Sequence, residues 1–496
     1  RSTLFPYTTL FRSVYRNYAQ TSKVHLEMAR GEVEHIQLVF PSKVNEEYRF
    51  TFDRYLKGIQ ISARELKKMN GYYDALVPFK NQLKCTDTLT AVWITVQCPS
   101  RVPVGKYHQT IKIEGSKHFT IQLDYNVHHT TIPLKSSIPI TVGVENRCVA
   151  EGLNDKEADK ERQRWVDFVL SYRMTPVFGT QITPERWQYE HSFSPWAWND
   201  KRSIRLLNDR RYSCYMLPFF TLSENELASL LCNIQKKGKL KESLFYIWDE
   251  PAYMEDYEQI KQKVNIIRKY ASDARILTTF FCGPRNGPRK GDLYAVFDYL
   301  KHHIHVATIS LAPCKGNEEE VQHIRYKVPE GIDWWSYVCW QPGGNEPNFL
   351  LQMKGIQQRA IMWRTWKNGS QGFLYWNCNI YHKRNPFTYI TDMPHGDGIL
   401  IYPGDILGRK GPIASARLER WRDGAEEMEL LRLVEKNYSK EKADTLLNIV
   451  YSSPLSFIEK AHNIPFFRKE LLDQLDKTIP IDYKLRINGK IGRAHV

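Results

Sequence analysis

The chain has 496 residues, of which 42% are hydrophobic and 25% are charged, values that are typical of soluble globular proteins and exclude a disordered or fibrous chain. This length indicates two or three domains, because single domains cluster near ~100 to 200 residues. The formal net charge of +15 comes from basic residues interspersed with acidic ones, without an arginine-rich stripe, which argues against a nucleic-acid-binding protein.

Both ends of the chain read as artefacts of gene assembly. The run TLFPYTTLFRS at residues 3–13 is similar to one reading frame of a sequencing adapter, and IGRAHV at residues 491–496 is similar to the partner adapter. We therefore interpret residues 1–13 and 491–496 as adapter-derived and exclude them from the predicted fold, as one would a tag. The natural N-terminus is then expected to be missing, so the sequence supports no inference about a signal peptide.

Residues 14–132 are predicted to form an antiparallel β-sandwich that acts as a support domain. The clearest strand runs from Phe119 to Val127, where apolar residues alternate with polar ones and so place one face on a core. Weaker runs of the same kind occur at residues 35–40, 48–52, 92–96 and 107–113. Several short strands without a helical pattern are typical of a sandwich.

Residues 133–413 are predicted to form a catalytic (β/α) barrel, because strands alternate with helices there. A helix is predicted at residues 155–170, and another begins at Ser223, where Glu226 stands at the spacing of a capping box. Short apolar strands bounded by amphipathic helices require a parallel sheet, and a region of roughly 280 residues suits a closed barrel better than an open sheet. The predicted strands are residues 139–144, 215–220, 244–248, 275–281, 305–310, 333–339 and 372–377.

Residues 414–490 are predicted to be helical. Helical patterns cover residues 425–435, 439–451 and 467–475, with no strand among them. We expect a C-terminal helical extension packed on the outside of the barrel. The predicted fold class is therefore a multi-domain α/β protein, with a β-sandwich, a barrel and a helical extension in that order.

Cysteine spacing and hydropathy exclude further classes of protein. The nine cysteines are widely spaced and form no CxxC pair, which argues against a disulfide scaffold and a zinc site. No apolar run approaches the ~18 residues that a membrane-spanning helix needs, so we expect no transmembrane segment.

The strongest candidates for chemistry are Asp249 and Glu250 in the sequence LFYIWDEP, residues 244–251. These carboxylates end an apolar strand, and the catalytic groups of a barrel lie at the C-terminal ends of its strands. Neighbours in a regular strand point to opposite faces, so both can face one site only if the strand has begun to curl, which Pro251 favours. Two acids this close do not both ionise easily, which favours the protonated form of one of them, as a general acid needs. From the motif alone, a helix cap formed by Asp249 or a pair of solvated loop acids stays equally open.

Aromatic and polar residues near the ends of later predicted strands are candidates for substrate contact. Asn377, His395 and Asp397 lie in polar loops, where turn formation is the alternative role. Arg173 lies at a helix-to-strand junction, where an ordinary salt bridge is the alternative. Six aromatic residues, which suit the apolar faces of sugar rings as well as a protein core, are Trp334, Trp335, Tyr337, Trp340, Tyr375 and Trp376.

Five motifs follow one another along this chain: WDEP (248–251), WWSYVC (334–339), GFLYWN (372–377), GDG (396–398) with YPG (402–404), and SARLERWRDG (415–424). Their order resembles that of glycoside hydrolase family 123. Each motif is weak alone, but five in the same order indicate relationship across nearly the whole chain. The resemblance implies a β-N-acetylgalactosaminidase-like enzyme with an N-terminal β-sandwich, a (β/α)8 TIM-like barrel and a C-terminal extension, in a bacterial periplasmic, surface or secreted location.

The resemblance also implies a retaining mechanism in which the 2-acetamido oxygen of the substrate attacks the anomeric carbon. Glu250 would then be the general acid and base, and Asp249 would orient the acetamido N–H. Tyr337 and Trp376 would contact the sugar. The partner implied is a glycan with a terminal 2-acetamido sugar, and no metal or organic cofactor is implied. Further predicted substrate-binding residues are Trp335, Asn377, Asp397 and Arg173.

Two alternatives stay open at this point. The first is the same mechanism with another specificity, for β-linked N-acetylglucosamine or a sulfated or acidic glycan, for which the positive net charge is a hint. The second is a non-catalytic carbohydrate-binding protein that keeps the barrel and its aromatic residues. The intact pair Asp249 and Glu250 argues against the second.

Overall fold

The computed structural model describes residues 3–6, 23–52, 58–183, 188–380 and 396–478, and the chain divides into two compact units. The sheet unit contains residues 1–134, 351–366 and 413–496. The barrel unit contains residues 135–350 and 367–412. The sheet unit therefore combines the N-terminal strands with two segments that lie far away in the sequence.

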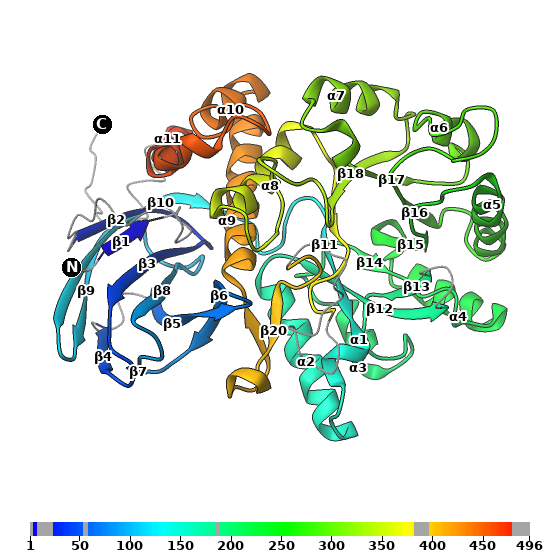
Figure 1. Cartoon of the computed structure of the whole chain (residues 1–496). Helices are drawn as coiled ribbons and strands as arrows, with labels where there is room; N and C mark the ends of the chain where they lie inside the picture. Colours follow the sequence, from blue (N-terminus) through cyan, green and yellow to red (C-terminus); the bar gives the residue numbers. More distant parts are fainter. Residues whose placement is uncertain (1–2, 7–22, 53–57, 184–187, 381–395, 479–496) are drawn as a thin grey trace, which may run out of the picture. The chain divides into compact units, whose positions relative to one another are not determined.

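Two five-stranded β-sheets make up most of the sheet unit (Figure 1). Their strand orders are β1-β3-β8-β5-β6 and β2-β10-β9-β4-β7, and all neighbours pair antiparallel except β2 and β10. Along β10, Ile121, Leu123, Tyr125 and Val127 are buried and alternate with more exposed residues, which confirms the alternation read from the sequence. The strands are β1 (Thr3–Pro6), β2 (Lys23–Arg30), β3 (Val33–Pro41), β4 (Glu47–Phe52), β5 (Gln60–Met69), β6 (Tyr72–Pro78), β7 (Gln82–Lys84), β8 (Leu89–Gln97), β9 (Gly105–Glu114) and β10 (His118–Thr131).

Strand β1 belongs to the N-terminal segment that we interpret as adapter-derived. Its four residues pair antiparallel with β3, from Thr3 opposite Val39 to Pro6 opposite Ile36. At this edge of the sheet, β3 presents backbone N–H and C=O groups that an extended apolar segment can satisfy. Residues 1–2, 7–13 and 491–496 lie outside the described residues.

Three helices after residue 413 belong to the sheet unit: α9 (Ala416–Asn437), α10 (Lys440–Leu447) and α11 (Ile464–Asp476). Helix α11 lies against β2 and β10, and α9 lies against β6. The sequence predicts an extension on the outside of the barrel, whereas the structure groups these helices with the sheets. The reason is an apolar stripe on α11, where Phe467, Leu471 and Leu472 are fully buried.

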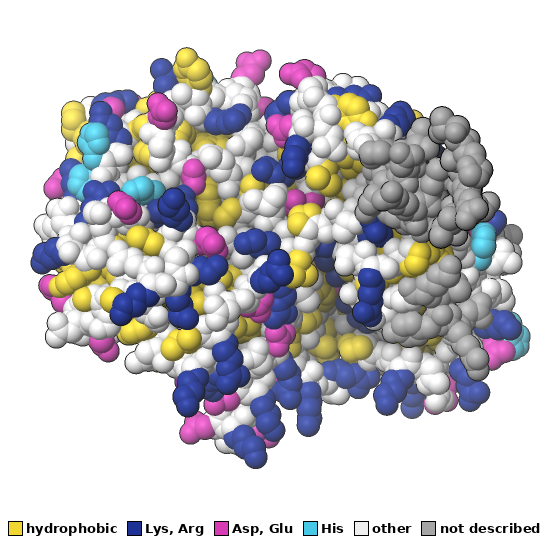
Figure 2. Space-filling view, turned by 180° about the vertical axis from the view of Figure 1, so that it is seen from behind, with side chains coloured by type: hydrophobic (Ala, Val, Ile, Leu, Met, Phe, Trp, Pro, Cys, Tyr) yellow, Lys and Arg dark blue, Asp and Glu magenta, His cyan; other side chains and the backbone are white. Residues whose placement is uncertain are grey.

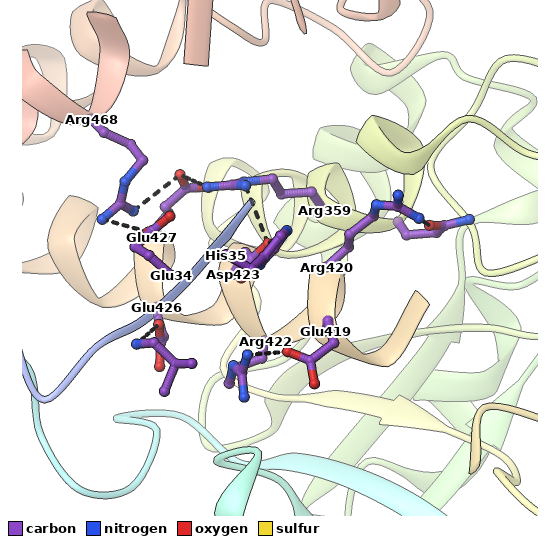
Figure 3. A network of polar contacts seen from close by, with 12 residues as sticks. Glu34, His35, Arg359, Glu419, Arg420, Arg422, Asp423, Glu426, Glu427 and Arg468 are labelled. Atoms are coloured by element: carbon purple, nitrogen blue, oxygen red, sulfur yellow. Dashed lines mark hydrogen bonds and ion pairs between the residues drawn. The ribbon is translucent and has the colours of Figure 1, made fainter. Parts of the chain in front are cut away.

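A buried network of charges joins β3, residues 355–366 of α8 (Gly355–Lys367), α9 and α11 within the sheet unit (Figure 3). Arg359 donates to Glu427 Oε2 over 2.9 Å and to Asp423 Oδ2 over 3.2 Å. Arg468 lies 3.4 Å from Glu427 and 2.8 Å from Glu34. All five side chains are at most 1% exposed. Because loss of one partner would leave an uncompensated buried charge, this network fixes the packing of elements that are distant in sequence.

The barrel unit is built on a sheet with nine strands among the described residues, in the order β13-β12-β11-β19-β18-β17-β16-β15-β14. Eight of them run parallel, and β13 pairs antiparallel with β12. The two ends of the sheet meet where the Phe193 N–H donates to the Met216 carbonyl over 2.7 Å, so the sheet is nearly closed. The strands are β11 (Ile140–Glu145), β12 (Thr175–Thr183), β13 (Gln188–Ser192), β14 (Tyr215–Met216), β15 (Ser243–Trp248), β16 (Arg275–Phe280), β17 (Val306–Ser310), β18 (Asp333–Val338) and β19 (Phe373–Tyr375).

The nine-stranded sheet differs in one respect from the (β/α)8 barrel implied by the resemblance. Strand β13 stands between β12 and β14, where an eight-stranded barrel would join these two directly. All seven strands predicted in this region are present, although the one predicted at residues 215–220 is reduced to β14, Tyr215–Met216. The chain is therefore a multi-domain α/β protein with N-terminal β-sheets and a nearly closed, barrel-like sheet.

Helices follow the parallel strands, as the sequence predicts. The predicted helix at residues 155–170 is present as α2. The predicted capping box at the start of α4 is also present: the Ser223 N–H donates to Glu226 Oε2 over 2.8 Å, and the Glu226 N–H donates to Ser223 Oγ over 3.3 Å. The remaining elements are α1 (Asn146–Ala150), α2 (Asp155–Ser171), α3 (Lys201–Leu206), α4 (Glu224–Lys236), α5 (Met254–Arg268), α6 (Ala295–Leu300) and α7 (Glu318–Lys327), with short strands β20 (Ile401–Pro403) and β21 (Pro412–Ala414).

Charged side chains of both signs are mixed on the surface. On the face drawn in Figure 2, Lys and Arg side chains are scattered and Asp and Glu side chains lie between them. All nine cysteines are free thiols. Within the described ranges, none of the helices has the length and apolar character that crossing a membrane requires.

Candidate active site

Strand β15 curls at its C-terminal end, where the two adjacent carboxylates lie. Its register with β16 shifts between Tyr246 and Trp248, which marks a β-bulge. Glu250 then adopts a φ of +43°, which is uncommon for a residue other than glycine and breaks the alternation of the strand. Both Asp249 and Glu250 are accessible to solvent. The predicted curl is therefore present, and neither carboxylate is buried away from solvent.

Asp249 is held by two hydroxyl donors on one of its oxygens. Tyr246 donates to Oδ1 over 2.7 Å, and Thr279 of β16 donates to the same atom over 2.8 Å. The second oxygen, Oδ2, accepts no hydrogen bond from the residues that the structure describes. The surrounding protein raises the pKa of Asp249, while the hydrogen bonds from Tyr246 and Thr279 oppose that shift. Asp249 thus has a fixed orientation and one free acceptor.

Glu250 is placed by contacts to two neighbouring strands. Its backbone N–H donates to Thr279 Oγ1 over 3.0 Å, and one carboxylate oxygen accepts a hydrogen bond from the Tyr337 hydroxyl of β18. The surrounding protein, which removes part of the water around the carboxyl group, and the nearby charge of Asp249 raise the pKa of Glu250 to about 7, against the opposing effects of Tyr337 and Arg285. A carboxyl group with this pKa is protonated for a large part of the time near neutral pH, as a general acid requires.

An open hollow lies at this end of the sheet, with about 550 Å³ of atom-free space that includes open solvent. Asp249 is part of its wall, whereas Glu250 is not and lies beside it. The residues that line the hollow are Thr141, Gly143, Val144, Val177, Gly179, Tyr189, His191, Tyr246, Asp249, Leu374, Tyr375, Trp376 and Asn377.

Tyr375 and Trp376 form an aromatic part of the wall and are held by Asp397. The Tyr375 hydroxyl and the Trp376 Nε1–H each donate to Asp397 Oδ1 over 3.0 Å. Asp397 is fully buried, so it positions these rings and does not itself face the hollow. Gly143 permits this arrangement, because a Cβ there would come within 1.8 Å of the Trp376 carbonyl oxygen.

Asn377 also lines the hollow, but part of its side chain is used locally. Its Oδ1 accepts the N–H of Asn379 over 2.9 Å, which is the turn role left open by the sequence. The amide nitrogen of the Asn377 side chain has no hydrogen-bond partner among the described residues. Asn377 therefore keeps a free donor at the wall of the hollow.

Tyr189 and His191 are wall residues that sequence reasoning missed. They stand two residues apart on β13, so they share one face of the strand, and that face lines the hollow. Glu190, on the other face, accepts hydrogen bonds from the N–H groups of Phe219 and Thr221 over 2.8 and 2.7 Å and so anchors the strand. The sequence QYEHS has no strong strand signal, and only the pairing with β12 reveals its place.

A sequence model described as the glycoside hydrolase 123 catalytic domain matches residues 160–434, more than half of the chain. The chain belongs to glycoside hydrolase family 123. This confirms the resemblance seen in the motifs. The fold agrees with it, because a solved family 123 glycoside hydrolase from Clostridium perfringens matches with a TM-score of 0.67 at 14% identity, over 98% of this chain and 99% of that one.

The structural analysis of the Clostridium perfringens enzyme concerns the hydrolysis of glycolipid glycans, and at this identity the match shows the shared fold alone. A family 5 xyloglucanase from Bacteroides ovatus matches at 11% identity, over 82% of this chain and 99% of that one, with a TM-score of 0.28 that is too low to support an argument. No curated protein sequence matches the chain. Family membership makes this protein a glycosidase.

Two predicted substrate residues of this glycoside hydrolase lie away from the hollow. Trp335 is 1% exposed and packs in the apolar interior of the barrel-like sheet. Arg173 is buried and lies at the N-terminal end of β12. Asp249 and Glu250 follow the C-terminal end of β15, which runs parallel to β12, so Arg173 lies at the opposite end of the sheet. Neither residue is among the wall residues of the hollow, so the structure does not bring the two to the place where the sequence predicts substrate contact.

The other predicted residues are divided between the hollow and its surroundings. Trp334 is 2% exposed and Trp340 is 44% exposed, and neither is among the wall residues. Tyr337 is buried, donates a hydrogen bond to Glu250 and is not among the wall residues. His395 lies outside the described residues.

Proposed function

We propose that this family 123 enzyme removes a terminal β-linked N-acetylgalactosamine from glycans by a retaining, substrate-assisted mechanism. The observation that supports the proposal is that the two neighbouring carboxylates have different surroundings, each suited to a different role. Asp249 lines the hollow as an oriented hydrogen-bond acceptor with a free oxygen, and Glu250 beside it has the raised pKa of a proton donor. We also infer that the sheet is a (β/α)8 barrel in which β13 is an insertion, because the other eight strands run parallel.

In the first step, protonated Glu250 gives its proton to the glycosidic oxygen as the bond from that oxygen to the anomeric carbon breaks. The carbonyl oxygen of the 2-acetamido group forms a new bond to the anomeric carbon on the opposite face, which gives an oxazolinium intermediate. Asp249 Oδ2 accepts the acetamido N–H and stabilises the positive charge that develops on this group. No carboxylate is needed below the ring, which is why two adjacent acids suffice.

In the second step, ionised Glu250 takes a proton from a water molecule, whose oxygen attacks the anomeric carbon and opens the oxazolinium ring. Two inversions give net retention, and Glu250 is protonated again for the next cycle. Trp376, which is partly exposed, supplies the aromatic surface against which a pyranose ring packs. The glycolipid glycans of the Clostridium perfringens enzyme suggest a class of natural substrate to test first.

The decisive experiment is a released-sugar assay on matched glycans that end in β-linked N-acetylgalactosamine or N-acetylglucosamine. We expect release of the former with β configuration at the first-formed product, and preferential release of the latter would move the assignment to the alternative specificity. Asp249→Asn should lose most activity on 2-acetamido substrates, whereas near-normal activity would contradict the assisted mechanism. A hexosamine thiazoline, which imitates the cyclised intermediate, should bind tightly, and a merely carbohydrate-binding protein would ignore it.

A further inference from the structure

Beyond Glu250, hydrogen bonds join the loop that follows β15 to the loop that follows β16. The mechanism above does not use the residues of these two segments. The Arg285 N–H donates to the Ala252 carbonyl over 2.7 Å, and the Met254 N–H donates to Asn286 Oδ1 over 2.7 Å. These bonds join the segment that carries Tyr253 to the segment that carries Arg285. Both side chains are therefore presented from a fixed backbone, which favours a binding role over a freely moving surface pair.

Arg285 is an exposed cation without a carboxylate partner within 4 Å among the described residues. Its guanidinium lies near the phenol of Tyr253, and its positive charge lowers the pKa of Glu250. Arg289, four residues on in the same loop, differs in that it forms ion pairs with Asp292 and Asp298. Arg285 thus keeps its charge available next to the proposed general acid.

The position of Arg285 coincides with the side on which the leaving group must lie. The sugar to be released occupies the hollow, whose wall includes Asp249 but not Glu250, Tyr253 or Arg285. Glu250 must contact the glycosidic oxygen, so the sugar beyond that oxygen leaves the hollow past Glu250. Tyr253 is 48% exposed there and offers an aromatic face to that sugar.

We propose that Tyr253 and Arg285 form a binding subsite for the sugar on the leaving-group side, and that this sugar or its direct substituent carries an acid group. A guanidinium matches the geometry of a carboxylate or a sulfate ester through paired N–H donors, and the phenol of Tyr253 supplies a surface for the ring. The preferred substrate class is then a 2-acetamido sugar linked to an acidic saccharide. This inference rests on the proposed function and narrows its substrate.

Three glycans test the subsite, each ending in the same β-linked N-acetylgalactosamine: one with a neutral galactose next to it, one whose galactose carries a carboxylate sugar, and one whose galactose carries a sulfate. For the wild type and each variant, kcat/KM on each glycan is measured at a pH well below the pKa of Glu250. Each value is divided by kcat/KM for an aryl glycoside, which lacks the second sugar. We expect the wild type to prefer at least one acidic glycan by about tenfold, as for a charge-assisted contact, and the preference to fall with added salt.

Arg285→Gln should abolish this preference, and Lys290→Gln, which removes an exposed positive charge from the same loop, should retain it. A preference for both acidic glycans would show that the subsite accepts a carboxylate or a sulfate. A preference for one of them would show which acid group the subsite recognises. Equal wild-type values for the neutral and acidic glycans would overturn the subsite while leaving the proposed function intact, as would a preference that survives in Arg285→Gln. Failure of the wild type to cleave the aryl glycoside would overturn the proposed function and the subsite with it.

Discussion

The imidazole of His191 lies flat against the phenol ring of Tyr246, with ring centroids 4.2 Å apart and ring planes 9° apart. Tyr246 is the residue whose hydroxyl holds Asp249 over 2.7 Å. Burial lowers the pKa of His191 to about 3, so this imidazole is neutral at physiological pH. His191 therefore steadies the tyrosine without placing a cation next to Asp249, which accepts the acetamido N–H in the proposed mechanism.

His191→Ala should lower kcat on an aryl 2-acetamido glycoside by about three- to tenfold, because a stacked aromatic pair contributes about 0.5–1.5 kcal/mol beyond its buried area. His191→Phe keeps a flat ring against Tyr246 and should recover most of the loss. The pH profile should not change in either variant, since the imidazole carries no charge. Equal losses in the two variants, or a shifted profile, would point to a different role for His191.

The sequence predicted the two adjacent carboxylates as the candidate site because their signal is local. Asp249 and Glu250 end an apolar strand directly before a proline, and the bulge and positive φ that bring them to one site follow from that interruption. Tyr189 and His191 were missed for the opposite reason. Their hairpin is a polar segment that becomes a wall of the hollow only through its pairing with β12, a contact that no periodicity encodes.

Trp335 shows which features of a side chain's position strand alternation predicts and which it does not. Trp335 and Tyr337 share one face of β18, as residues two apart must. Tyr337 is nearer the C-terminal end and reaches Glu250, while Trp335 lies about 6–7 Å further back along the strand, in the core. The sequence thus gives the face correctly, but the depth along the strand depends on the tertiary structure.

Tyr337→Phe should move the alkaline limb of the pH profile to higher pH. The hydrogen bond from Tyr337 lowers the pKa of Glu250, which burial and the charge of Asp249 raise to about 7, so its removal should raise that pKa further. The proton donor then stays protonated to a higher pH. The measurement is kcat/KM against pH on a glycan with a poor leaving group, which needs the proton. An unmoved limb, or one at lower pH, would remove Glu250 from the role of general acid.

Thr279→Val should lower kcat by about tenfold or more, because the hydroxyl both donates to Asp249 and accepts the backbone N–H of Glu250. Thr278→Val is the matched control. Thr278 is the adjacent residue on β16, it is fully buried, and its hydroxyl has no hydrogen-bond partner among the described residues. Assays on the same aryl glycoside should show near wild-type kcat for the control. Similar losses in both variants would mean that repacking of β16, and not the hydroxyl contacts, limits activity.

Arg359→Met should reduce the free energy of unfolding by about 3–5 kcal/mol, because it leaves Glu427 and Asp423 buried without their shared cation (Figure 3). Lys469→Met removes an exposed partner of Asp473 on α11 and should cost no more than about 1 kcal/mol. Urea unfolding of the two variants at one pH makes the comparison. A cost for Arg359→Met as small as that for Lys469→Met would show that the buried network contributes little to stability.

His128 predicts how stability depends on pH on the alkaline side. Burial lowers the pKa of His128, but hydrogen bonds to Asp476 of α11 and Glu27 of β2 outweigh burial and raise it to about 9. The pKa of His128 is higher in the folded protein than its ordinary value of 6.5, so proton binding stabilises the folded state. This stabilisation is complete below pH 6.5 and is lost as the pH rises through 9. The sheet unit should therefore lose up to about 3 kcal/mol between these two pH values.

His128→Gln should flatten that loss, because a neutral amide keeps a hydrogen bond to the carboxylates but binds no proton in this pH range. The measurement is the free energy of unfolding from urea titrations at pH values below 6.5 and near 9, for the wild type and the variant. The variant should be less stable than the wild type at the lower pH and should approach it at the higher pH, since most of the stabilisation from the charged wild-type imidazole is lost by then. Parallel curves for the two proteins would mean that His128 is not the group that responds to pH.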